Sequence, residues 1–144
     1  MTIEWLRMRI QEEQERRKRE EQTLHRLPLA MEELHELVKD CLADYTAAFG
    51  AESAEIAHRP GRLKIIAREQ QNGKWQDVSQ VDVIAVQDLP GIRVERGESS
   101  VAIQIGLLPN DKLFYRDCEQ DTFLTVEDLT RRILDRALFP KLKE

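Results

Sequence analysis

Hydrophobic residues in the first third of the chain follow a helical spacing. They recur in alternating steps of three and four residues, which is typical of one face of a long helix. These positions are Ile3, Leu6, Ile10, Leu24, Leu27, Met31, Leu34, Val38, Cys41 and Tyr45. Between the two apolar blocks the same register passes through Glu13, Arg17 and Glu20. The pattern therefore predicts a long amino-terminal helix whose apolar seam is interrupted by a charged stretch.

Pro28 lies inside this helical pattern. Proline lacks an amide hydrogen and its ring collides with the carbonyl four residues earlier, which costs about 3 kcal/mol in a regular helix. We therefore expect the helix to be kinked or broken near Pro28. Residues 1–27 are expected to form a charged helical arm, and residues 28–144 a single α+β domain. Pairs such as Glu13 with Arg17 are expected to keep the arm helical where it has no core.

From Ala51 onward the pattern changes to an alternation of apolar and polar residues, which is typical of strands. Asn72-Gly73 is the strongest turn signal, because a type I′ hairpin turn needs positive φ at both central residues. The short connections favour sequential antiparallel pairing, so we predict an antiparallel β-meander of about five to six strands. The predicted strands are Ser53–His58, Arg62–Gln70, Lys74–Asp88, Ile92–Arg96, Ser100–Leu108 and Lys112–Cys118.

A short carboxyl-terminal helix is predicted after Thr125, which suits the N-cap position and has Asp128 three residues later. One side of this helix is apolar, with Val126, Leu129, Ile133, Ala137 and Leu138. The strands also have one apolar face, as Leu63 and Ile65 show, and that face needs a cover. We predict that the short helix packs on the sheet together with the helix that follows Pro28. The expected fold class is α+β.

Composition limits the kinds of partner. The chain has 144 residues, of which 41% are hydrophobic, enough for one core. Its formal net charge of -5 disfavours general binding to nucleic acid, whose phosphates select basic surfaces. No apolar run approaches the ~18 residues of a membrane span, and no secretory signal is visible at the amino terminus. We therefore expect a cytoplasmic protein with neither a nucleic-acid nor a membrane partner.

The sequence contains no recognisable catalytic, cofactor or metal site. His25, His35 and His58 have no second ligand at helical metal-binding spacing. Glycine clusters that would cradle a phosphate and serines in a nucleophile elbow are both missing. Cys41 and Cys118 are far apart in the sequence, and we expect each to be a small buried or half-buried hydrophobic residue. The sequence therefore predicts a protein that is not an enzyme and holds no cofactor.

The first three turns of the predicted helix favour an interaction function. Trp5 and Met8 lie off the main seam and widen its apolar surface, which would be exposed on an isolated monomer unless the arm folded back on its own sheet. We predict a protein-interaction or scaffolding protein that binds itself, as a homodimer, or another protein. The expected interaction residues are Ile3, Trp5, Leu6, Ile10, Leu24 and Leu27.

Two other functions fit the same sequence. The first is a module that binds a small apolar ligand or a peptide in a pocket between sheet and helices, where small residues would leave room. Those residues are Ala67, Ala85, Ala102 and Gly106. The second is assembly with a larger complex. The order of elements is similar to that of type III secretion chaperones and of small dimeric nucleoid-associated proteins, without a motif shared residue by residue.

Overall fold

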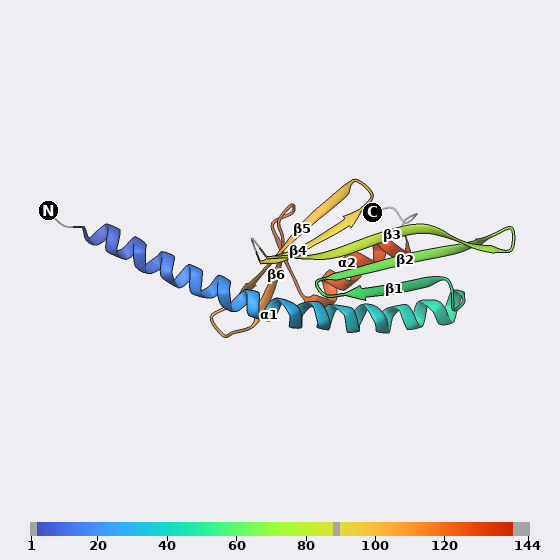
Figure 1. The fold of residues 1–144 in the computed structure, drawn as a ribbon, viewed down its shortest axis with the longest axis horizontal. Coiled ribbons are helices and arrows are strands. Elements are labelled where there is room, and N and C mark those ends of the chain that lie inside the picture. The colour runs from blue at the N-terminus through green and yellow to red at the C-terminus, as the bar shows by residue number, and fades with distance from the viewer. Residues whose placement is uncertain (1–2, 88–89, 140–144) are drawn as a thin grey trace.

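The computed structural model describes residues 3–87 and 90–139. A long helix, α1 (Glu4–Phe49), precedes an antiparallel sheet and a short helix, α2 (Val126–Leu138) (Figure 1). The seven strands pair in chain order, each with the next. They are β1 (Ala54–Arg59), β2 (Arg62–Gln71), β3 (Lys74–Val86), β4 (Gly91–Arg96), β5 (Ser99–Leu107), β6 (Leu113–Asp117) and β7 (Thr122–Leu124). The predicted α+β class is confirmed, with one strand more than predicted.

Local turn chemistry places the strands close to their predicted positions. Asn72 and Gly73 have φ values of 54° and 79°, so both adopt the left-handed conformation that their hairpin turn requires. The additional strand, β7, has three residues, too few for an alternating pattern to indicate it. The predicted end of the third strand, Asp88, lies outside the described residues.

Both helices pack on one face of the sheet and share a single hydrophobic core. The apolar face of the strands alternates as predicted, with Leu63 and Ile65 fully buried on β2. On α1 the buried apolar residues are Leu27, Ala30, Met31, Leu34, Val38 and Leu42. α2 contributes Leu129, Ile133, Leu134, Ala137 and Leu138. The sheet thus holds the second half of α1, while the first half extends beyond it (Figure 1).

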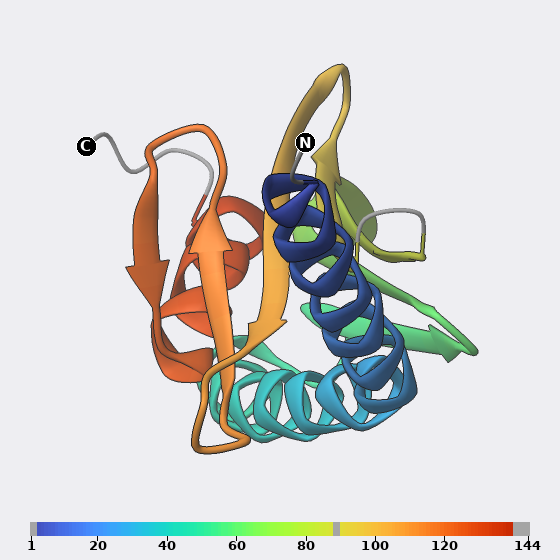
Figure 2. The same ribbon diagram turned by 90° about the vertical axis from the view of Figure 1, so that its left-hand side faces the viewer.

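The proline does not break α1, which runs without interruption from Glu4 to Phe49 with Pro28 inside it. The helix axis nevertheless changes direction between the projecting part and the part packed on the sheet (Figures 1 and 2). Since Pro28 cannot donate a hydrogen bond to the carbonyl of Leu24, a bend in this turn is its expected consequence. The prediction of a kink rather than a break therefore describes the molecule.

The carboxyl-terminal helix is fixed at its start by a capping box. The Thr125 hydroxyl accepts a hydrogen bond from the Asp128 amide, and the Asp128 carboxylate accepts one from the Thr125 amide. A second attachment is the buried Asp117 at the end of β6, which accepts a hydrogen bond of 2.6 Å from the Arg132 guanidinium. These contacts join α2 to the sheet at the edge where β7 lies.

Candidate interaction site

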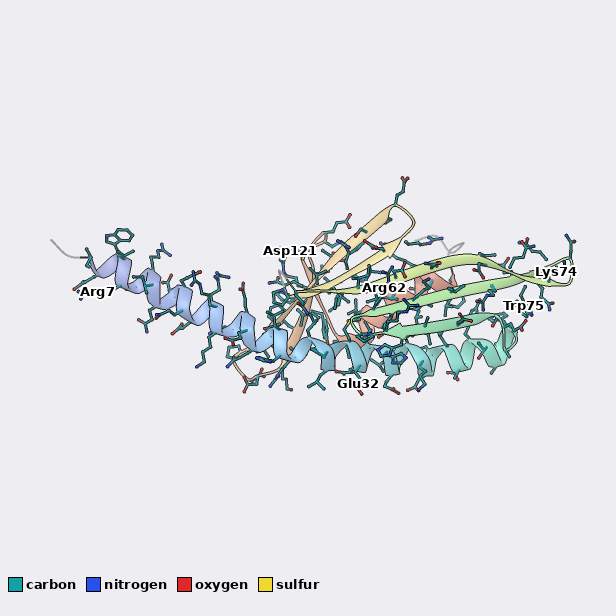
Figure 3. The ribbon with its side chains drawn as sticks, in the orientation of Figure 1. Arg7, Glu32, Arg62, Lys74, Trp75 and Asp121 are labelled. Atoms are coloured by element: carbon teal, nitrogen blue, oxygen red, sulfur yellow. The ribbon has the colours of Figure 1, made fainter. Side chains whose placement is uncertain are left out.

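The first three turns of α1 carry a cluster of exposed apolar side chains, which we call the apolar tip. Trp5 is 67% exposed and Met8 is 62% exposed, the largest values in the cluster. The other members are Ile3, Leu6 and Ile10, each at least 40% exposed. This part of the helix stands clear of the sheet, as the free side chain of Arg7 illustrates (Figure 3). The tip therefore does not fold back on its own sheet.

The six residues predicted for interaction do not form one surface. Four of them belong to the exposed tip, but Leu24 is half-buried and Leu27 is only 3% exposed. Thr23, also buried, marks the point where α1 meets the sheet. Leu27 belongs to the core of the chain itself, so it is not available to a partner.

Between the tip and the sheet, the arm is held together by ion pairs. Glu13 accepts hydrogen bonds from Arg16 at 2.7 Å and from Arg17 at 3.0 Å. Arg16 also pairs with Glu20. The hydrogen bonds from Arg16 and Arg17 lower the pKa of Glu13 to about 2. The predicted pairing of Glu13 with Arg17 is thus present, and it is extended by a pair three residues apart.

The arm is electrically balanced, whereas the rest of the chain is acidic. Residues 4–22 contain six acidic and six basic side chains, so the net charge of -5 belongs to the remainder. The charges occur in blocks: Arg7 and Arg9 are followed by Glu12, Glu13 and Glu15, then by residues 16–19, all basic, and then by Glu20 and Glu21. An alternation of this kind can recognise a surface that carries the opposite alternation.

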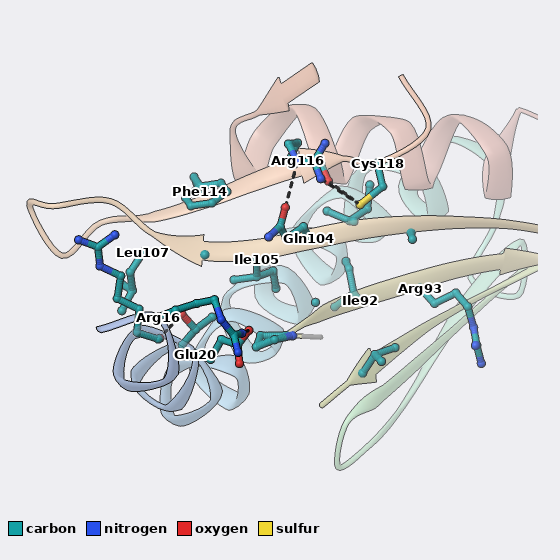
Figure 4. Close-up of a pocket in the computed structure, with 18 of the residues that line it drawn as sticks. Arg16, Glu20, Ile92, Arg93, Gln104, Ile105, Leu107, Phe114, Arg116 and Cys118 are labelled. Atoms are coloured by element: carbon teal, nitrogen blue, oxygen red, sulfur yellow. Dashed lines mark hydrogen bonds and ion pairs between the residues drawn. The ribbon is translucent and has the colours of Figure 1, made fainter. Parts of the chain in front are cut away.

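A groove of about 810 Å³ lies between the base of the arm and strands β4, β5 and β6. The arm contributes charged residues, among them Arg16 and Glu20, while the sheet contributes mostly small and apolar ones (Figure 4). The lining from the sheet includes Pro90, Gly91, Ile92, Ala102, Ile103, Ile105, Gly106, Leu107 and Phe114. Two of the small residues considered for a pocket, Ala102 and Gly106, lie in this lining, but the Phe114 ring fills the space beside Gly106. The groove opens beside the arm and not within the core.

Cross-strand pairs shape the wall of the groove that β5 and β6 form. Gly106 faces Phe114, and a Cβ atom on Gly106 would come within 2.3 Å of the Phe114 ring. Glycine here permits the close approach, and the ring also makes an edge contact with Phe123. Beside it, Arg116 donates to Gln104 at 2.9 Å and to Asp121 at 2.7 Å. The wall is therefore rigid and already hydrogen-bonded.

The structure brings together two histidines that the sequence left apart. The rings of His35 on α1 and His58 on β1 stack with their centroids 4.3 Å apart. Burial and the neighbouring His58 lower the pKa of His35. No sequence spacing signals this pair, because it depends on the placement of α1 against the first strand. The stacking fixes the helix to the edge of the sheet.

Both cysteines are free and exposed, so the prediction that they are buried or half-buried was wrong. Among residues 3–87 and 90–139, no group of three or more histidine, cysteine or acidic side chains is placed to hold a metal ion. Within the same ranges, none of the helices has the length and apolar character that crossing a membrane requires.

Comparisons with known proteins do not assign the chain to a family. No protein-family model matches it, and neither a curated protein nor a solved structure does.

Proposed function

We propose that the protein is a non-enzymatic interaction protein that forms a homodimer through the apolar tip of its arm. The observation that supports this proposal is the exposure of five large apolar side chains at the end of a helix that has no core to cover them. Contiguous exposed apolar surface of this kind marks interaction sites in monomeric structures.

Burial of the tip would contribute favourable free energy to association. Removing a large apolar side chain from water stabilises a complex by about 1.5–3 kcal/mol. A two-fold dimer buries the tips of both copies, and the sum competes with the loss of translational and rotational freedom. The arm is already helical through its ion pairs, so little ordering is needed on binding.

Sedimentation equilibrium on the full chain tests this proposal. We expect a dimer at micromolar concentrations, and we expect the double variant Trp5→Gln/Ile10→Gln to dissociate at least about a hundredfold more readily, since each 1.4 kcal/mol lost is tenfold. Leu29→Gln is the matched control, because Leu29 is a 64% exposed apolar residue of the same helix outside the tip. A wild-type chain that stays monomeric at these concentrations would refute the proposal.

The groove supports a second candidate function, the binding of a small apolar ligand or a peptide. Its volume of about 810 Å³ is that of a typical ligand site, and its sheet wall is largely apolar. Native mass spectrometry of the purified chain, with thermal shifts across a panel of lipids and metabolites, distinguishes this function. A bound molecule that leaves the protein monomeric would favour it over the dimer.

A further inference from the structure

We infer that the two arms of the dimer pair antiparallel, about a two-fold axis near Gln14 and Glu15, with each apolar tip in the groove of the other copy. This inference deepens the proposed function and depends on it. The groove opens beside the arm, and the apolar side chains of the tip are exposed. The occupant we assign to the groove is a second copy of this chain.

The charge pattern of the arm is self-complementary only in the antiparallel direction. A two-fold axis near Gln14 places Glu12 and Glu13 opposite the partner's Arg16 and Arg17, and the same contacts recur on the other side of the axis. Further out, Arg9 lies opposite the partner's Glu20. Opposite charges therefore meet at three pairs of positions on each side of the axis.

Parallel pairing gives the reverse result. In a parallel pair each seam residue meets its own copy, so Glu13 would face the partner's Glu13 and Arg17 the partner's Arg17. It would also bring the two domains together, and each carries the net charge of -5 that the arm lacks. Both effects oppose the parallel arrangement, because like charges repel at contact distance.

In the antiparallel pair, the arm is long enough for the tip of one copy to reach the groove of the other. Inverted about the proposed axis, Trp5 and Ile10 lie beside residues 19–24 of the partner, where its arm meets its sheet. Arg19, Glu20 and Thr23 line the groove along this stretch. Each domain then lies about 30 Å from the tip of its own arm, because the helix rises 1.5 Å per residue.

The groove accepts an apolar helix end better than a charged one. Its sheet wall presents the half-buried side chains of Leu107 and Phe114, and the arm side is mainly charged. Arg93 and Arg116 are the charged residues that the sheet adds to the lining. The tip of the partner would therefore set its apolar side chains against the sheet. Arg7 of each tip would lie near Glu21 of the copy whose groove the tip enters, and that carboxylate is exposed.

Pulsed electron paramagnetic resonance measures the direction of pairing. Nitroxide labels are placed singly at Arg7→Cys or Gln14→Cys in the full chain carrying Cys41→Ser and Cys118→Ser, since both native thiols are exposed. These two sites are one heptad apart, so a parallel pair gives them equal distances between labels. The antiparallel pair gives a short distance at Gln14 and one about 20 Å longer along the axis at Arg7.

Equal short distances at both sites in a dimer would overturn the antiparallel inference and leave the proposed function standing. Label distances that are long at both sites would show a dimer held elsewhere and overturn both. A wild-type monomer in sedimentation would remove the proposed function itself.

A charge introduced into the groove tests its occupant separately. Ala102→Lys places an ammonium group on an exposed position of the groove wall, and we expect it to weaken the dimer about tenfold or more. Ala57→Lys is the matched control, an exposed alanine on β1 away from the groove. A dimer that is equally stable with Ala102→Lys would show that the tip lies outside the groove. A different molecule found bound in the groove of the dimer would show the same.

Discussion

At the scale of residues, the stacked histidines link the stability of the fold to pH. His35 is half-buried against His58, and this burial together with the neighbouring His58 lowers its pKa below the ordinary value of 6.5. Glu32 and Glu36 act in the opposite direction, while Lys39 adds to the lowering. The neutral form of His35 is therefore the form that the folded chain favours.

We predict that the fold loses stability as the pH falls below 6.5, the ordinary pKa of His35. In this range the unfolded chain takes up a proton at His35 before the folded chain does, so protons favour unfolding. Urea unfolding at neutral pH and at about pH 5 measures the loss. His35→Gln keeps all the carboxylates and is expected to show a smaller loss, whereas an equal loss in both chains would contradict the prediction.

Single residues also show where sequence reasoning stops. Cys41 follows the three-four seam and was expected to be at least half-buried, yet the buried stripe passes through Val38 and Leu42 instead. An α-helix of 3.6 residues per turn drifts away from a 3.5-residue seam, so a helix lying on a sheet buries residues four apart. Asp117 was likewise unrecognised, because its burial depends on Arg132 of a distant element.

At the scale of elements, α1 combines a packed half and a projecting half in one helix. Pro28 lies inside this helix, next to the buried Leu27, and it removes one hydrogen bond of the helix there. Pro28 itself is exposed, so its replacement would change the helix without disturbing the core.

We predict that Pro28→Ala raises the free energy of unfolding by about 1–3 kcal/mol, because alanine restores the hydrogen bond to the Leu24 carbonyl and removes the clash of the ring. Urea denaturation monitored by circular dichroism measures the change. Leu29→Ala serves as a control at the adjacent exposed position, and we expect it to change stability by less than about 0.5 kcal/mol. Unchanged or lower stability of Pro28→Ala would show that the bend is required for packing.

Elements marked by local chemistry were predictable, and those defined by distant contacts were not. Asn72-Gly73 placed a hairpin, and Thr125 with Asp128 placed the start of α2. β7 escaped prediction because its three residues acquire strand character only by pairing with β6. The groove was also unpredictable in its location, since it forms where a bent helix passes strands far away in sequence.

At the scale of the whole molecule, charge is separated between a neutral arm and an acidic domain. In the antiparallel pair that we infer, the two domains would lie about 30 Å apart along the arms. This separation exceeds the screening length of about 10 Å at 0.1 M salt, so their mutual repulsion is weak. The contacts between oppositely charged arm residues are much shorter and dominate the response to salt.

We predict that the dimer dissociates about threefold to tenfold more readily at high than at low salt, because several exposed ion pairs of about 0.2–1 kcal/mol each are screened. Sedimentation equilibrium across a salt series measures the dissociation constant. Charge reversal in Arg16→Glu/Arg17→Glu is expected to weaken the dimer and to invert its salt dependence, because the new carboxylates would face Glu12 and Glu13 of the other copy. Tighter association at high salt would instead indicate that like charges face each other.

The three-residue strand β7 closes one edge of the sheet, and β1 at the other edge lies against α1. Both edge strands are short, with six residues in β1 and three in β7. Short edge strands disfavour growth by strand addition, the route to fibrils. An assembly made through a two-fold contact of the arms contains two copies and cannot grow further. The chain can therefore expose apolar residues at the end of its helix without polymerising.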